Sequence, residues 1–195
     1  LLRAMTIAAH SPSPSFALGY VAHRVAADEI ADLDLSGWRT LAVGSEPVEL
    51  ADLQSFARLV GPRGFDVSAF TLAYGLAEST LMVSSSRRDE PITLLRPESS
   101  SMRFGQPVTI RDEATLAADR DYDGSGWIAG LGYSIADSTV RVIGEDGREL
   151  PDDTLGEVIV TGGSVALGYT ADRPESSGVT TIDDGVLHTA DAGFI

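Results

Sequence analysis

The chain has 195 residues and a formal net charge of −15, which is too acidic for a surface that binds nucleic acid. Hydrophobic residues make up 43% of it and the mean hydropathy is +0.05, as in a globular protein without an integral membrane segment. All 14 basic residues are Arg and Cys is absent, which excludes a catalytic lysine, a thiol nucleophile and disulfides within this chain. We expect a cytoplasmic protein.

The first elements are short and punctuated by proline. The start has neither the basic lead nor the apolar core of a signal peptide, and residues 1–10 are interpreted as the end of a helix. Two prolines in Ser11–Ser15 predict a loop, after which Ser15 can cap a helix with apolar spacing over residues 16–26. A turn at residues 36–37 precedes a short buried strand at residues 39–43.

A glycine-led loop, Gly44–Pro47, follows that strand directly. Pro47 suits the first turn of a helix, and residues 48–60 have helical periodicity. A strand, a loop and a helix in this order place loop backbone at the carboxyl edge of a sheet, where ligands of open α/β sheets bind. Residues 1–85 alternate between helix and strand in this way, which indicates a parallel or mixed α/β layer.

The stretch Phe70–Leu81 combines an apolar strand with a polar turn. It breaks at Tyr74-Gly75 and then presents the carboxylate of Glu78 beside two hydroxyl groups. A carboxylate between apolar runs costs free energy unless it is paired, and a Mg²⁺ ion that bridges to a phosphate is one suitable partner. A solvated glutamate on a turn after a strand is the alternative interpretation of these residues alone.

The second half of the chain differs from the first in composition and in hydrophobic pattern. Residues 86–125 are polar and charged, and we expect an insertion with limited structure, such as a hairpin. Its Asp119-x-Asp121-x-Asp123 segment opens like a calcium loop, but Gly130 stands where the bidentate Glu is needed, so a solvated acidic loop is predicted. From residue 126 the pattern alternates, at residues 139–143 and 157–160, which is typical of a small barrel or sandwich.

Four motifs resemble those of the adenylate-forming superfamily and, within it, the fatty acyl-AMP ligases. They follow one another along the chain in the same order as in that family. Tyr74–Leu81 resembles the Tyr-Gly-x-(Thr/Ala)-Glu motif, and Val43–Val48 resembles the Gly-Ala-Glu-Pro loop. Glu157 with Gly168-Tyr169 is similar to a mostly architectural segment of the β subdomain. Leu187–Gly193 resembles the Arg-Thr-Gly-Asp-Leu-Gly motif, with Ala190 in place of the usual glycine.

The resemblance implies roles for individual residues. Glu78 is implied as the catalytic residue that binds Mg²⁺ at the ATP phosphates, and Asp191 as the acceptor for both ribose hydroxyls. Ala77 lacks the hydroxyl that acyl-CoA synthetases use at this position, so Ser79 or Thr80 is expected to replace it. The implied nucleotide-binding residues are Gly44, Ser45, Glu46, Pro47, Tyr74, Gly75, Leu76, Ala77, Ser79, Thr80 and Asp191.

The resemblance also implies an organisation and a reaction. We expect a fragment of the large N-terminal domain: a mixed α/β portion (residues 1–85), an insertion (86–125) and a small β-barrel-like subdomain (126–195). The implied cofactors are ATP and Mg²⁺, and the implied partners are a fatty acid, ATP or AMP, and an acyl carrier protein. The insertion disfavours coenzyme A as the acceptor. An acyl-CoA synthetase is the main alternative, and a non-catalytic adenylation-like domain, suggested by Ala190, is the other.

Overall fold

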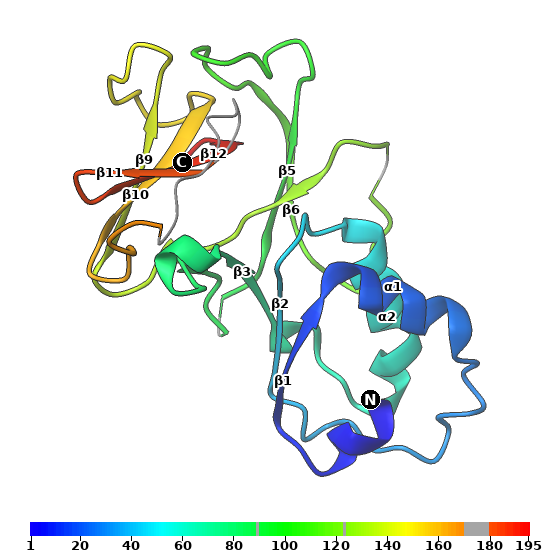
Figure 1. The fold of residues 1–195 in the computed structure, drawn as a ribbon. Coiled ribbons are helices and arrows are strands. Elements are labelled where there is room, and N and C mark those ends of the chain that lie inside the picture. The colour runs from blue at the N-terminus through cyan, green and yellow to red at the C-terminus, as the bar shows by residue number, and fades with distance from the viewer. Residues whose placement is uncertain (89, 123, 170–179) are drawn as a thin grey trace. The chain divides into compact units, whose positions relative to one another are not determined.

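The computed structural model describes residues 1–88, 90–122, 124–169 and 180–195, which form two compact units (Figure 1). The first unit contains Leu1–Tyr74, Ser85–Arg96 and Glu113–Tyr133. The second unit contains Gly75–Ser84, Pro97–Asp112 and Ser134–Ile195. The chain therefore passes between the units several times, including within strands β5 (Thr93–Pro97) and β6 (Ile110–Thr115).

The first unit is built on parallel strands, as the alternation of helix and strand predicts. β2 (Thr40–Gly44) pairs in parallel with β1 (His10–Pro14) on one side and with β3 (Phe70–Tyr74) on the other. Two short strands complete the order β1-β2-β3-β4-β8, namely β4 (Ser84–Ser85) and β8 (Tyr133–Ser134). The predicted helices are confirmed as α1 (Ser15–Arg24) and α2 (Leu50–Val60).

The core of the first unit is aromatic at its centre. Trp38, Phe56, Phe65 and Phe70 are buried and meet mainly edge to face, with ring centroids 5.2–6.4 Å apart. Short 3₁₀ turns connect the elements around this core: η1 (Leu2–Thr6), η2 (Gly61–Arg63) and η3 (Val67–Ala69).

The Ser-Pro segment differs from the loop that the sequence predicts. It forms β1, which lies at one edge of the sheet order and pairs only with β2. Pro12 and Pro14 fit there because an edge strand does not need every N–H group for the ladder. Ser15 also differs from its predicted role, because its hydroxyl accepts a hydrogen bond from Glu49 N (3.1 Å) at the start of α2 and does not cap its own helix.

Residues 86–125 carry more structure than the sequence indicates. β5 lies between β6 and β7 (Ile128–Ala129) in a three-stranded sheet, and Leu116 N donates to Ile92 O (2.9 Å) beside it. Ile92, Leu94, Ala114 and Leu116 are buried in the core of the first unit. The acidic segment after them is tied to α2, because Arg58 pairs with Asp121 at 2.7 Å; Asp123 lies outside the described residues.

The second unit contains an antiparallel sheet of order β11-β12-β10-β9. The sheet is open in the described residues, with β9 and β11 at its edges, so the expected β-barrel-like form is not closed. Val142, Ile143, Ile159, Val160 and Leu187 are buried. The second unit includes η4 (Ala77–Ser79), β9 (Ser138–Ile143), β10 (Gly156–Gly162), β11 (Thr181–Asp183) and β12 (Val186–Gly193). No helix among the described residues is both long and apolar enough to cross a membrane.

Candidate functional site

Two predicted site residues leave the sheet of the first unit at its carboxyl edge. Gly44 ends β2 and Tyr74 ends β3, and the parallel register Val43↔Leu72 places the two ends side by side. A Cβ on Gly44 would lie 2.7 Å from Ala73 O, a backbone atom that cannot move without breaking the sheet. Glycine is therefore required where the Gly44–Pro47 loop begins.

The Gly44–Pro47 loop is tied to the start of α1 by a hydrogen bond. Glu46 Oε1 accepts from Phe16 N at 2.6 Å, in the first turn of that helix. A carboxylate is favourable there because unpaired N–H groups give the N-terminus of a helix a partial positive charge. Ser45, with φ 72°, makes the turn that allows this bond. Glu46 thus has a structural role that the sequence motif did not indicate.

The Gly75–Leu81 loop of the second unit is folded tightly around a glycine. Thr80 (φ 56°) and Leu81 (φ 98°) both have left-handed backbone conformations, which turn the chain back toward Gly75. A Cβ on Gly75 would collide with the carbonyl of Leu81. The backbone bonds Ser79 N→Leu76 O (3.0 Å) and Leu81 N→Leu76 O (3.1 Å) close the loop. The sequence predicted this break in the strand, and its compactness explains why glycine stands there.

Two hydroxyl groups bind this loop to the turn that follows β10. Ser79 is fully buried, and its Oγ lies 3.1 Å from Ser164 Oγ. Thr80 Oγ1 donates to Ser164 O at 2.8 Å, and Ala166 N donates to Glu78 O at 2.8 Å. Both hydroxyls therefore stabilise the loop, whereas the sequence suggested that one of them replaces the hydroxyl absent at Ala77. That replacement remains a prediction.

The Glu78 carboxylate is oriented by a tyrosine from the same unit. Tyr169 Oη donates to Glu78 Oε1 at 2.5 Å, across 91 residues of sequence. This is a short, charge-assisted hydrogen bond, which is roughly twice as strong as a neutral one. The sequence reasoning counted Tyr169 as architectural, and no local pattern around it indicates a partner so distant in the chain. Glu78 is therefore a held carboxylate and not only a solvated side chain on a turn.

Asp191 lies in an irregular part of the β10–β12 pair. The register is Glu157↔Ala192 and Ile159↔His188, so the single residue Val158 faces the three residues 189–191. A bulge of this kind redirects side chains and is common beside functional sites. Ala190 at its centre has φ 61°, the left-handed conformation that favours glycine. Asp191 itself is exposed.

The predicted site residues are thus divided between the two units. Gly44, Ser45, Glu46, Pro47 and Tyr74 gather at the carboxyl edge of the first unit. The second unit contains the other predicted site residues, namely Gly75, Leu76, Ala77, Glu78, Ser79, Thr80 and Asp191.

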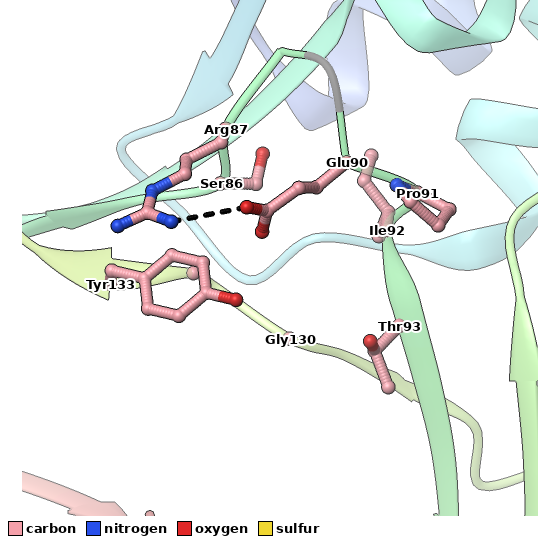
Figure 2. A pocket seen from close by; sticks show the side chains of 9 residues that line it. Ser86, Arg87, Glu90, Pro91, Ile92, Thr93, Gly130 and Tyr133 are labelled. Atoms are coloured by element: carbon pink, nitrogen blue, oxygen red, sulfur yellow. Dashed lines mark hydrogen bonds and ion pairs between the residues drawn. The ribbon is translucent and has the colours of Figure 1, made fainter.

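A separate open pocket of about 250 Å³ in the first unit is lined by none of these residues (Figure 2). The Arg87 guanidinium lies 4.2 Å from the centre of the Tyr133 ring and 3.1 Å from Glu90 Oε1. A hydrogen bond with Tyr133 lowers the pKa of Glu90 most, and a hydrogen bond with Arg87 lowers it further. The bond between Glu90 and Tyr133 also raises the pKa of Tyr133. The sequence reasoning missed this cluster because it treated the polar segment after residue 85 as an insertion.

Comparisons with known proteins place this chain in a family. The family model for AMP-binding enzymes matches residues 3–170. The medium-chain fatty acid–[acyl-carrier-protein] ligase JamA of Moorena producens is 31% identical over 161 residues, which are 82% of this chain and 26% of JamA. The long-chain fatty acid–AMP ligase FadD32 of Mycolicibacterium smegmatis is 32% identical over 171 residues, 87% of this chain and 26% of FadD32.

A solved structure agrees with these matches. The fatty acyl-adenylate ligase from L. pneumophila, crystallised with acyl adenylate and pyrophosphate, has a TM-score of 0.72 and 26% identity, covering 96% of this chain and 35% of its own. The chain therefore spans 26–35% of the length of these proteins. It belongs to the family of AMP-binding enzymes.

Proposed function

We propose that this chain is the nucleotide-binding part of a fatty acyl-AMP ligase. A carboxylate oxygen of the fatty acid attacks the α-phosphorus of ATP, the bond from that phosphorus to the bridging oxygen breaks, and pyrophosphate leaves. The thiol of a carrier protein's phosphopantetheine then takes the acyl group and releases AMP. The observation that supports this most is the constrained Gly75–Leu81 loop, which presents the Glu78 carboxylate inside a segment that matches the family.

The donor chemistry at Glu78 fits Mg²⁺. This ion is usually held by one or two carboxylates together with substrate phosphates and water, so one oriented carboxylate is a suitable protein ligand. Tyr169 now donates to Glu78 Oε1 and would have to share or release that oxygen. When bound, Mg²⁺ would neutralise charge that develops on the phosphates during the transfer.

Asp191 and the Gly44–Pro47 loop are proposed for two further contacts with the nucleotide. A carboxylate can accept from two adjacent hydroxyl groups at once, which suits the ribose, and Asp191 is exposed on its bulge. The Gly44–Pro47 loop and Tyr74 lie at the carboxyl edge of parallel strands, the usual ligand edge of such sheets, and are proposed for the adenine. Gly75–Ala77 are proposed to line the nucleotide and acyl channel.

The acyl acceptor is the finer part of the proposal. JamA is named as an acyl-carrier-protein ligase, and we infer the same class of acceptor here. We further infer that residues 86–125 disfavour coenzyme A. Deleting residues 88–120 would remove Ile92, Leu94, Ala114 and Leu116 from the core, so the test has to keep strands β5 and β6. Replacing residues 99–106 with a short turn preserves both strands, and coenzyme A should then become an acceptor.

ATP–pyrophosphate exchange by the intact protein tests the proposal. Glu78→Gln keeps the shape of the side chain but loses its charge, and the exchange rate should fall by about 100-fold or more, since metal stabilisation is worth several kcal/mol. Glu145→Gln is the control, because Glu145 is exposed in the turn between β9 and β10. Unchanged exchange by Glu78→Gln at limiting Mg²⁺ would remove Glu78 from the metal site. No exchange by the unmodified protein would favour a non-catalytic domain.

A further inference from the structure

Glu157 makes two contacts with the strand that carries Asp191. It lies at the start of β10, and its side chain is 27% exposed. Its Oε1 accepts from Ala190 N at 3.2 Å, and its Oε2 lies 3.5 Å from His188 Nδ1. Each carboxylate oxygen therefore has its own partner, and the two partners are the residues on either side of Thr189 in β12.

The bulge needs these contacts because its backbone leaves the regular ladder. Three residues of β12 face the single residue Val158, so their N–H groups cannot all pair with β10. Thr189 Oγ1 satisfies part of the bulge: it donates to Val158 O at 2.7 Å and accepts from Asp191 N at 3.1 Å. The N–H of Ala190 points elsewhere and is taken by the carboxylate of Glu157.

Ala190 immediately precedes Asp191, so its backbone torsion angles determine the direction of the Asp191 side chain. Ala190 has φ 61°, a conformation that an alanine does not adopt readily by itself. Rotation about the Ala190 backbone would swing the following residue, so the bond that holds Ala190 also sets the direction of Asp191. His188 Nδ1 lies 3.5 Å from the other carboxylate oxygen of Glu157.

We propose that Glu157 is a positioning residue for the ribose contact of Asp191, with His188 as its supporting partner. The proposal rests on the proposed function, in which Asp191 accepts from the ribose hydroxyls. Glu157 touches no nucleotide in this scheme and acts only through the Ala190 N–H. Its loss should therefore weaken recognition of the ribose hydroxyls and leave the chemical step nearly unchanged.

The test measures kcat and KM of the intact protein in ATP–pyrophosphate exchange, with ATP and with 2′-deoxy-ATP. The unmodified protein should prefer ATP. Asp191→Ala should remove most of that preference, and Glu157→Ala should reduce it by up to about tenfold, the range of one lost hydrogen bond, mainly through the KM for ATP. Glu157→Gln should retain most of the preference, because an amide oxygen still accepts from Ala190 N. Glu145→Ala, an exposed glutamate of the same unit, is the control.

The outcomes separate this inference from the function on which it rests. If Asp191→Ala leaves the preference for ATP unchanged, the proposed ribose site is wrong. If Asp191→Ala removes the preference while Glu157→Ala keeps it, or slows both nucleotides equally, the positioning role is overturned. The double variant should lose no more preference than Asp191→Ala alone, because the two residues act through one contact. Should Glu157→Ala not fold, His188→Ala is expected to reduce the same preference to a smaller extent, and an unchanged preference in it would count against the role.

Discussion

Replacing Ala190 with glycine should stabilise the protein, although the same replacement in a strand usually destabilises. Ala190 has φ 61°, and the left-handed conformation costs a residue with a Cβ about 1–2 kcal/mol. Glycine removes that cost but gains about 0.4–1 kcal/mol of conformational freedom in the unfolded chain. The net free energy of unfolding should rise by about 0.5–1 kcal/mol, which corresponds to a Tm increase of about 1–4 °C for a chain of this size.

Ala192 provides a matched control two residues along the same strand. It is exposed and pairs with Glu157, and its backbone is not among those with positive φ. Glycine there should lower stability by about 0.5–1 kcal/mol, as in any strand. Thermal unfolding of both variants, followed by circular dichroism, should therefore give Tm shifts of opposite sign. Equal destabilisation by Ala190→Gly and Ala192→Gly would refute the left-handed conformation and, with it, the strained bulge.

Three further predictions concern other positions. Gly75→Ala should lower the free energy of unfolding by about 1–3 kcal/mol in a denaturant titration, because the new Cβ meets the Leu81 carbonyl, whereas Gly163→Ala has open space and should change little. Burial raises the pKa of Asp52 above its ordinary value of 3.8, so the ionised form is penalised and wild-type stability falls as pH rises through this range. Asp52→Asn should therefore raise Tm at pH 7, and the gain should shrink on acidification and vanish below the ordinary value. Tyr169→Phe removes the hydroxyl that donates to Glu78 Oε1, so the intact protein should need up to about tenfold less Mg²⁺ for half-maximal exchange, and a higher requirement would contradict competition at that oxygen.

Local patterns predicted the regular elements well. The apolar spacing that indicated a helix over residues 16–26 corresponds to α1, and alternation at residues 139–143 and 157–160 corresponds to β9 and β10. The loop prediction for the Ser-Pro segment was wrong because the conformation of this segment depends on the strand with which it pairs. Residues 10–14 become a strand only through pairing with β2, thirty residues later, and the local proline signal opposes that result. Pairing and burial likewise brought β5 and β6 into the core, although the segment that contains them is polar at residues 87–91 and charged at residues 111–123.

The residues of the candidate site also differ in whether local sequence could predict them. The sequence identified Glu78 and Asp191 as single residues within motifs, because each motif is local. It could not identify the side chains that hold them, since Tyr169 is 91 residues from Glu78 and Glu157 is 33 residues from Ala190. Such contacts depend on the register of strands and on the path of turns. A residue that a motif marks as architectural can therefore orient a functional group.

The two proposed carboxylates of the second unit both lie close to backbone with positive φ. Glu78 precedes two residues with positive φ, and Asp191 follows one, and none of the three is glycine. Backbone of this kind costs of order 1–3 kcal/mol per residue and persists only where surrounding contacts determine it. Here Thr80 Oγ1 is bound to Ser164 O, and Ala190 N to the carboxylate of Glu157. If folding already supplies the free energy that fixes these loops, then little ordering remains when a nucleotide binds, and preorganisation of this kind raises affinity without any added contact. The bonds that hold the loops should then contribute to nucleotide affinity, although they touch no nucleotide.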